Sequence, residues 1–292
     1  MPNTLNKSSL EEFVWKPDLF KDKVAFITGG AGSICRVQAE LLVLLGAKAA
    51  LIGRNAEKTE KAALEVDQLS HEPGSVLGIG NVDVRNVQQL KAAIDKTVER
   101  FGRIDYVIAG AAGNFIADMT NLSAKAFKAV VDIDLLGSYN TVKAALPELV
   151  KSKGSVIFVS ATLHYTGTPF QIHVSAAKAG VDALARALAV ELGPLGIRVN
   201  CIAPGIIGNS EGLSRLSFGT KPEEYTKRVP LQRVGSTKDI ANATVYLFSQ
   251  AADYVTGTIE VVDGGAWNLG TVMGSLPYPD LLLSHQKINS KL

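Results

Sequence analysis

The chain has few residues of the kinds that build metal centres or disulfide scaffolds. Its 292 residues include two cysteines and four histidines, and their positions lack the close spacing of zinc ligands. Cys35 and Cys201 are far apart in the sequence and form no disulfide framework, so we expect both to be reduced. No apolar run is long enough to span a bilayer, and residues 1–23 lack the apolar core of a secretory signal. The sequence therefore gives no reason to expect a metal, a disulfide or a membrane span.

An excess of charge of one sign is also missing. Lys and Arg number 30 against 28 Asp and Glu, which leaves a formal net charge of +2. Without a long basic run we expect neither nucleic acid nor a membrane surface as a partner, although small phosphorylated molecules remain candidates. Hydrophobic residues make up 47% of the chain, which is enough to bury one large core.

One stretch near the N-terminus carries the strongest signal of function. Residues 24–27 are continuously apolar, as is typical of a strand buried on both faces of a parallel sheet. The glycine-rich sequence TGGAGSIC follows at 28–35, and an amphipathic helix then runs to Gly46. Such a turn brings backbone close to a pyrophosphate and points helix amides at it. We predict a dinucleotide site in which Gly32 supplies conformational freedom and the Ser33 hydroxyl contacts a phosphate oxygen.

The end of a second apolar strand, at 49–53, indicates which cofactor fits. Enzymes that use NAD usually have an acidic residue there for the ribose 2′-hydroxyl, whereas a 2′-phosphate needs cations. Here Arg54 follows the strand, and Lys58 lies one helical turn later. The two cations predict NADPH rather than NADH.

Strands and helices alternate along the rest of the chain. Further strands are expected at 76–80, 104–108, 155–160, 197–203 and 257–265, with helices over 87–101, 123–149, 173–192 and 239–249. This alternation predicts an α/β fold with a doubly wound parallel sheet of the Rossmann type in a single domain. We place an N-terminal extension at 1–20, the domain at 21–267 and a C-terminal tail at 268–292.

These motifs resemble the short-chain dehydrogenase/reductase family over roughly residues 21–267. Thr28, Gly29 and Ile34 match the family's cofactor turn, whereas Ser33 and Cys35 stand where it usually has glycines. The segment at 109–110 also departs from the family's commonest form. The resemblance implies a homodimer or homotetramer paired through the helices at 123–149 and 173–192. It also implies cofactor contacts from Gly29, Ile34, Asp83, Val84, Ala112, Lys178, Pro204, Gly205 and Ile207.

The family's usual catalytic tyrosine is missing. Family members place it four residues before a lysine, so that both lie on one helix face. The lysine here is Lys178, but Val174 takes the place of the tyrosine. Because valine donates no proton, a simple carbonyl reductase is disfavoured. Asp134 stands where the family usually has an asparagine, and we predict that it approaches Lys178 and that the pair holds one water as the proton source.

Two segments, AAGNF at 111–115 and HVSAAK at 173–178, are most similar to the peroxisomal 2,4-dienoyl-CoA reductases, above all those of fungi. That group also lacks the tyrosine. The resemblance implies an NADPH-dependent reduction of 2,4-dienoyl-CoA to 3-enoyl-CoA in the β-oxidation of unsaturated fatty acids. It implies an acyl-CoA site that includes Arg54, Arg85, Asn114, Phe115, Ser123, Ser175 and Arg215.

The last three residues, Ser290, Lys291 and Leu292, form the tripeptide that a peroxisomal import receptor reads at a free C-terminus. We therefore expect delivery to the peroxisome matrix through that receptor.

Two other functions stay open on the sequence alone. One is an NADPH-dependent 3-ketoacyl, steroid or other carbonyl reductase that uses Tyr165 or His173 as a displaced acid. The other is a non-catalytic NADPH-binding protein that has kept the fold.

Overall fold

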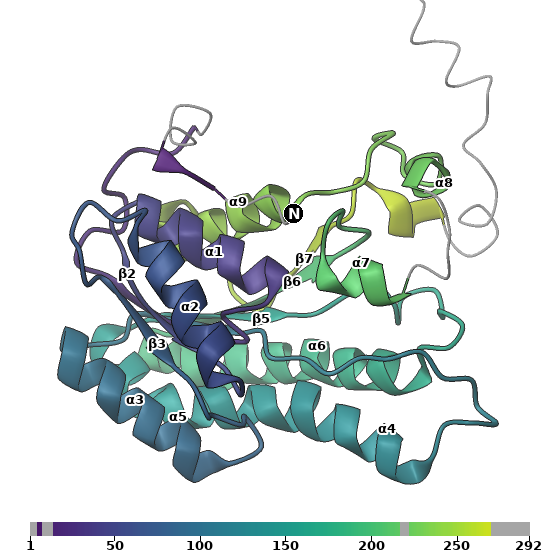
Figure 1. Cartoon of the computed structure of the whole chain (residues 1–292), viewed down its shortest axis with the longest axis horizontal. Coiled ribbons are helices and arrows are strands. Elements are labelled where there is room, and N and C mark those ends of the chain that lie inside the picture. The colour runs from purple at the N-terminus through teal and green to yellow at the C-terminus, as the bar shows by residue number, and fades with distance from the viewer. Residues whose placement is uncertain (1–4, 8–13, 217–221, 270–292) are drawn as a thin grey trace, which may run out of the picture.

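The computed structural model describes residues 5–7, 14–216 and 222–269 (Figure 1). Its strands form one parallel seven-stranded sheet in the order β3-β2-β1-β4-β5-β6-β7. The strands are β1 (Val24–Thr28), β2 (Lys48–Ile52), β3 (Val76–Ile79), β4 (Tyr106–Ala109), β5 (Ser155–Val159), β6 (Arg198–Pro204) and β7 (Ile259–Val262). The strand order reverses between β1 and β4, and open sheets of this kind bind ligands at the carboxyl ends of the strands beside that reversal. The predicted doubly wound α/β fold is confirmed.

Helices cover both faces of the sheet (Figure 1). One face is covered by α1 (Ser33–Leu44), α2 (Ala56–Asp67) and α9 (Thr237–Phe248), and the other by α3 (Val87–Phe101), α5 (Gly137–Ser152) and α6 (Ile172–Leu192). Short 3-10 helices lie at Gly193–Leu195, Gln250–Ala252 and Ala266–Leu269. The remaining helices are α4 (Ala124–Val131), α7 (Glu211–Leu216) and α8 (Pro222–Thr226). None of the helices in the described ranges is long and apolar enough to cross a bilayer.

The two hydrophobic cores explain why the strands are apolar without alternation. Successive strand residues point to opposite faces, so Ile27 of β1 enters the core under α1 while Phe26 enters the core on the other face. All five residues of β1 are buried. A strand with polar residues at alternate positions would leave them buried in one of these cores.

The long helix expected at 123–149 is interrupted. Ser123 caps α4, and a π-helical turn at Asp132–Leu136 joins α4 to α5. The sequence pattern does not reveal this π-helical turn, because the helices before and after it, α4 and α5, are both amphipathic. It contains Asp134, and π-helical turns often lie at functional sites.

Part of the N-terminal extension packs against the domain of the same chain. Phe20 is buried, and its ring contacts Tyr106 edge to face at 5.5 Å. The indole nitrogen of Trp15 donates to Asn242 Oδ1 on α9 at 2.7 Å. Residues 270–292, which include the C-terminal tripeptide, lie outside the described part of the chain.

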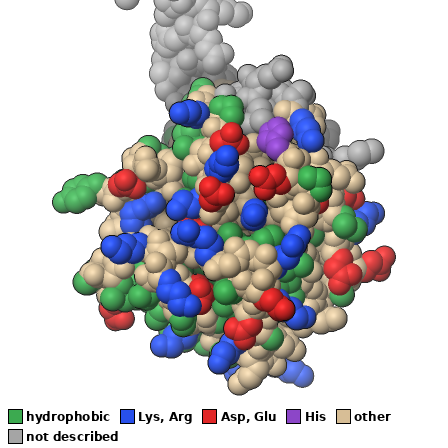
Figure 2. Space-filling model, turned by 90° about the vertical axis from the view of Figure 1, so that its left-hand side faces the viewer, with side chains coloured by type: hydrophobic (Ala, Val, Ile, Leu, Met, Phe, Trp, Pro, Cys, Tyr) green, Lys and Arg blue, Asp and Glu red, His purple; other side chains and the backbone are tan. Residues whose placement is uncertain are grey.

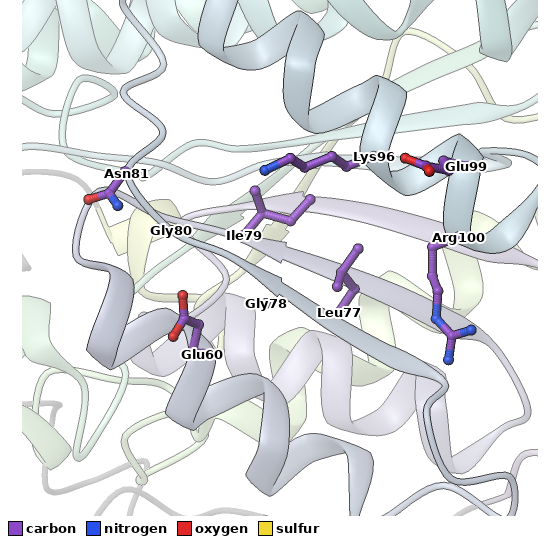
Figure 3. Close-up of a pocket in the computed structure, with 9 residues that line it drawn as sticks. All are labelled: Glu60, Leu77, Gly78, Ile79, Gly80, Asn81, Lys96, Glu99 and Arg100. Carbon is purple, nitrogen blue, oxygen red and sulfur yellow. The ribbon is translucent and has the colours of Figure 1, made fainter.

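The edge strand β3 carries a groove of about 600 Å³ between α2 and α3 (Figure 3). Gly78 and Gly80 lie on its floor, and Lys96 and Arg100 of α3 lie along one side. A Cβ atom on Gly80 would lie 2.2 Å from the Cα atom of Ala56, so this glycine lets α2 approach the sheet. The face at the left of Figure 1 has basic and acidic side chains interspersed (Figure 2). None of the predicted site residues lines this groove.

Candidate functional site

A cavity of about 810 Å³ opens at the carboxyl ends of β1, β4, β5 and β6. Most of the predicted site residues line it, namely Gly29, Gly32, Ser33, Ile34, Arg54, Lys58, Asp83, Val84, Ala112, Asn114, Asp134, Lys178, Pro204, Gly205 and Ile207. Four others, Arg85, Phe115, Ser123 and Ser175, do not line it, and the side chain of Arg215 lies outside the described part of the structure. Glu211 of α7 and Tyr225 of α8 also belong to the lining, so the segment after β6 covers part of this cavity.

The glycine turn gets its conformational freedom from Gly29. This residue has φ +68°, and a Cβ atom on it would lie 2.8 Å from the carbonyl oxygen of Gly110. Gly32 has φ −79° in the extended region, which any residue adopts, so the prediction that Gly32 supplies the freedom is wrong. A Cβ atom on Gly32 would meet the Gly29 oxygen at 3.1 Å, and Gly32 is needed for space alone. The Ser33 hydroxyl accepts a hydrogen bond from the backbone N–H of Glu211 at 3.1 Å, which ties α7 to the turn.

Cys35 and Gly110, which both depart from the family's usual sequence, are adjacent in the fold, and the small size of one makes room for the other. A Cβ atom on Gly110 would lie 2.2 Å from the sulfur of Cys35. The cysteine at 35, where the family usually has glycine, therefore requires a residue without a side chain at 110. Burial raises the pKa of the Cys35 thiol to about 12, against a smaller opposing effect of the Lys178 charge. The thiol is a neutral packing group, and both cysteines of the chain are free and buried.

The end of β2 presents cations to the cavity. Arg54 and Lys58 both line it, and the Asn55 side chain caps α2 by accepting from the Lys58 backbone N–H at 2.8 Å. The Lys58 ammonium forms an ion pair with Glu211 of α7 at 2.5 Å. Glu211 thus holds both Ser33 and Lys58, and a phosphate that binds Lys58 has to compete with this carboxylate.

Arg85 is turned toward Asp83 rather than into the cavity. Its guanidinium donates two hydrogen bonds to the Asp83 carboxylate, at 2.9 and 2.6 Å. These bonds lower the pKa of Asp83 to about 2. Asp83 is therefore a carboxylate at the adenine end of the predicted site, and Arg85 fixes its orientation.

Asp134 and Lys178 meet beneath the cavity. Asp134 Oδ2 lies 3.2 Å from Lys178 Nζ, and both side chains are buried. The other carboxylate oxygen accepts the backbone N–H of Gly113 at 2.7 Å, and Lys178 Nζ donates to the Val159 carbonyl at 2.8 Å. Oδ2 is buried, and apart from the ion pair with Lys178 it has no hydrogen-bond partner among the described residues.

The position of the missing tyrosine is apolar. Val174 is 2% exposed and packs with Val130 and Ala177. No phenol stands near the lysine at this position of α6, and the carboxylate of Asp134 is the ionisable group beside the ammonium.

Tyr165 is not placed as a substitute acid. Its hydroxyl donates to the buried carboxylate of Asp182 at 3.2 Å, and Asp182 also accepts from Ser160 at 2.5 Å and pairs with His164 at 2.8 Å. Burial, followed by the charge of Asp182, raises the pKa of Tyr165 above its usual range. Tyr165 does not line the cavity, and its proton is directed at Asp182.

His173 is fully buried, with its ring centroid 4.3 Å from that of Phe115. Burial lowers the pKa of His173, against smaller opposing effects of the Phe115 backbone and Asp134. The neutral ring packs against Phe115, and its nitrogens have no direct access to the cavity.

Three further predicted substrate residues, Phe115, Ser123 and Ser175, are not part of the cavity wall. Phe115 is 38% exposed, Ser123 caps α4 by accepting from the Ala126 N–H, and the Ser175 hydroxyl is buried without a partner among the described residues. Arg215 lies on α7, and only its backbone is described.

Gln171, Glu211 and Trp267 are among the lining residues that the sequence analysis did not predict. Gln171 directly precedes α6 and bonds Asn114, a contact that no spacing in the sequence indicates. Glu211 could have been predicted as a site residue, because it is an acidic residue after the Pro-Gly loop that ends β6. Among the described residues no group of three or more His, Cys, Asp or Glu side chains is placed to hold a metal ion.

Comparison with known proteins agrees with this geometry. Residues 29–266 match the family model described as enoyl-(acyl carrier protein) reductase. The chain is 63% identical over 290 residues, 99% of both chains, to the (3E)-enoyl-CoA-producing peroxisomal 2,4-dienoyl-CoA reductase of Saccharomyces cerevisiae. It is 42% identical to the protein of the same name from Danio rerio, over 87% of this chain and 84% of the relative.

Among solved structures, a short chain dehydrogenase from Bacillus anthracis is similar with a TM-score of 0.77 and 36% identity, over 89% of this chain and 100% of that one. The residues matched by the family model, 29–266, include nearly all of those that line the cavity. The chain belongs to the short-chain dehydrogenase/reductase family.

Proposed function

We propose that this protein reduces 2,4-dienoyl-CoA to 3-enoyl-CoA with NADPH, in the β-oxidation of unsaturated fatty acids. The observation that carries the proposal is the buried Asp134–Lys178 pair at 3.2 Å beside a valine in place of the tyrosine. Identity of 63% over nearly the whole chain to a reductase of that name supports it.

The residues at the cavity fit NADPH. The turn at Gly29 has the backbone freedom and the space that a pyrophosphate needs, and α1 begins directly behind it. Arg54 and Lys58 are placed for the 2′-phosphate, and Asp83 for the adenine end. Ser33, Ile34 and Val84 serve the same half, whereas Ala112, Lys178, Pro204, Gly205 and Ile207 serve the nicotinamide half. NADPH supplies a hydride to the substrate when it is bound.

The residues of the chain have to stabilise the negative charge of the intermediate and supply a proton to the substrate. Hydride addition at the distal end of the diene moves negative charge through the conjugated system to the thioester oxygen. This dienolate needs hydrogen-bond donors at the oxygen and a proton at the α-carbon. Asn114 lines the cavity and serves as the donor, and Ser175 is the second candidate donor.

Asp134 and Lys178 hold the water that delivers the proton. Asp134 Oδ2 accepts one hydrogen of this water, and the ammonium of Lys178 polarises the water oxygen and stabilises the hydroxide that remains after the proton has gone to the α-carbon. One hydride and one proton are added, and the remaining double bond lies between the third and fourth carbons. A phenol at the oxygen, as in carbonyl reduction, is not required.

Arg54, Arg85, Phe115, Ser123 and Arg215 bind the acyl-CoA; Arg54 already lines the cavity, whereas Arg85 has to leave Asp83 to reach a phosphate. The protein works in the peroxisome matrix and reaches it through the import receptor that reads Ser290-Lys291-Leu292. It assembles as a homodimer or homotetramer through α4, α5 and α6, where Tyr139, Val150 and Val190 are exposed apolar side chains.

Paired assays of the purified full-length chain test the function. NADPH oxidation is followed with a 2,4-dienoyl-CoA and, separately, with a 3-ketoacyl-CoA, together with the loss of dienoate absorbance. We expect turnover of the dienoyl-CoA and a 3-enoyl product. Turnover of the ketone alone would indicate a carbonyl reductase, and tight NADPH binding without turnover of either would indicate a non-catalytic protein.

A further inference from the structure

The loop that carries Asn114 is fastened to the start of α6. Asn114 Nδ2 donates to Gln171 Oε1 at 2.7 Å, and the backbone N–H of Ala117 donates to the Phe170 carbonyl at 3.3 Å. Asn114 and Gln171 both line the cavity. Two successive residues before α6 thus hold the loop after β4.

A backbone group sets the orientation of both amides. The N–H of Phe115 can only donate, and Asn114 Oδ1 accepts it at 2.8 Å. The NH₂ group of Asn114 therefore faces Gln171, and Gln171 has to present its carbonyl oxygen in return. One N–H of Asn114 is used in this bond, and the second N–H of the planar amide remains for another acceptor.

The burial of Gln171 contributes little to the stability of the fold. It is 2% exposed, and its Nε2 has no hydrogen-bond partner among the described residues. A buried amide group left unpaired costs free energy, so an apolar side chain of the same length would serve the fold as well. Phe170 beside it has φ +63°, a conformation that is costly for a bulky residue and persists only where its surroundings hold it. Strain and an unpaired amide at adjacent residues indicate a functional constraint.

We propose that Gln171 is the positioning residue of Asn114. Its carbonyl oxygen fixes the Asn114 amide so that the second Nδ2 N–H is directed at the thioester oxygen of the bound acyl-CoA. The inference rests on the proposed function and deepens it, because it names what keeps the donor for the dienolate in place before the substrate arrives.

Gln171→Met tests the assignment, because methionine has a similar length and no oxygen to accept the bond. Removal of one donor to a developing oxyanion costs about 10²–10³ in turnover, and we expect loss of its orientation alone to cost roughly 10-fold in kcat. Affinity for NADPH should not change. In Asn114→Ala the donor is gone, so adding Gln171→Met to that variant should cost nothing more, which is the non-additivity expected of residues that act as a unit.

Gln38→Met is the matched control. Gln38 is also fully buried, donates one 2.7 Å hydrogen bond to Thr244 and leaves Oε1 without a partner, but it lies on α1 away from Asn114. It should change the unfolding temperature about as much as Gln171→Met does and leave kcat unchanged. Gln171→Ala is the second variant for the case that methionine lowers the yield of folded protein, and the same pattern is expected of it.

Normal kcat in folded Gln171 variants would overturn the assignment, and so would a double variant whose losses multiply. An equal loss of kcat in Gln38→Met would show that the effect is structural. Absence of dienoyl-CoA turnover in the unaltered chain would overturn the proposed function first, and this assignment with it.

Discussion

Replacement of Asp134 is the sharpest test of the proposed chemistry. Asp134→Ala removes a fully buried carboxylate, one oxygen of which lies 3.2 Å from the Lys178 ammonium. Loss of a general acid or of the group that holds one costs about 10²–10⁴ in rate, and we expect turnover to fall by about 10²-fold or more. A 10²-fold loss corresponds to about 2.7 kcal/mol of transition-state stabilisation. Affinity for NADPH should change little, because Lys178 keeps its bond to the Val159 carbonyl.

The same substitution also affects stability, and the two effects have to be separated. Breaking a buried ion pair by removing one partner costs about 3–5 kcal/mol, so kcat is normalised to the folded fraction from urea unfolding. Asp105→Asn is the matched control. Asp105 is a buried carboxylate that pairs with Arg103 at 2.6 Å and Lys23 at 3.3 Å, and it does not line the cavity. We expect this variant to lose stability and to keep kcat.

Lys178→Ala is expected to lower both turnover and NADPH affinity, since we propose that the lysine contacts the nicotinamide ribose as well as the water. The contrast between the two variants separates the proton source from the cofactor site. Near-normal turnover in folded Asp134→Ala would remove Asp134 from the mechanism, and Tyr165 and His173 would be the next residues to replace.

Four further predictions follow from the structure and the sequence. Arg54→Asp should reverse or abolish the preference for NADPH over NADH, measured as the ratio of kcat/KM, and equal use of both cofactors by the unaltered protein would contradict it. Deletion of Leu292 should leave an active protein in the cytosol, as imaged in cells without a full-length copy. Sedimentation at micromolar concentration should show a dimer or tetramer, and a monomer alone would disprove the assembly. Gly110→Ala should lower the free energy of unfolding by about 1–3 kcal/mol through overpacking against Cys35, and Cys35→Ala should restore most of that loss.

The fold was predictable because both faces of the sheet are covered. Strands such as β1 and β2 are apolar throughout, and the turns and amphipathic helices between them leave little choice of topology. The side chains of Asn55 and Asn86 cap α2 and α3, and asparagine is a residue type typical of helix starts. Local chemistry determines these features, and a single sequence contains it.

The site was predictable in composition but not in geometry. Residue types at the strand ends indicated the cofactor, whereas the compensation between Cys35 and Gly110 joins positions that are 75 residues apart in the numbering. The bond between Asn114 and Gln171 is of the same kind. A hydrophobic or charge pattern along the chain reports which face a residue lies on, and it does not report which side chain on another element it meets.

The two most unusual positions of the site are best understood as one change. In the usual family pattern the lysine stands beside a phenol and lowers its pKa, and the proton goes to a substrate oxygen. With Val174 in that place the ammonium of Lys178 loses this partner, and it is buried, so it needs another negative group. Asp134 supplies it from the π-helical turn, at the position where the family usually has a neutral asparagine. In the mechanism proposed above, the carboxylate that balances the lysine also binds the water. The loss of the acid at the oxygen and the gain of the carboxylate then move the proton source toward carbon, as reduction of a conjugated thioester requires.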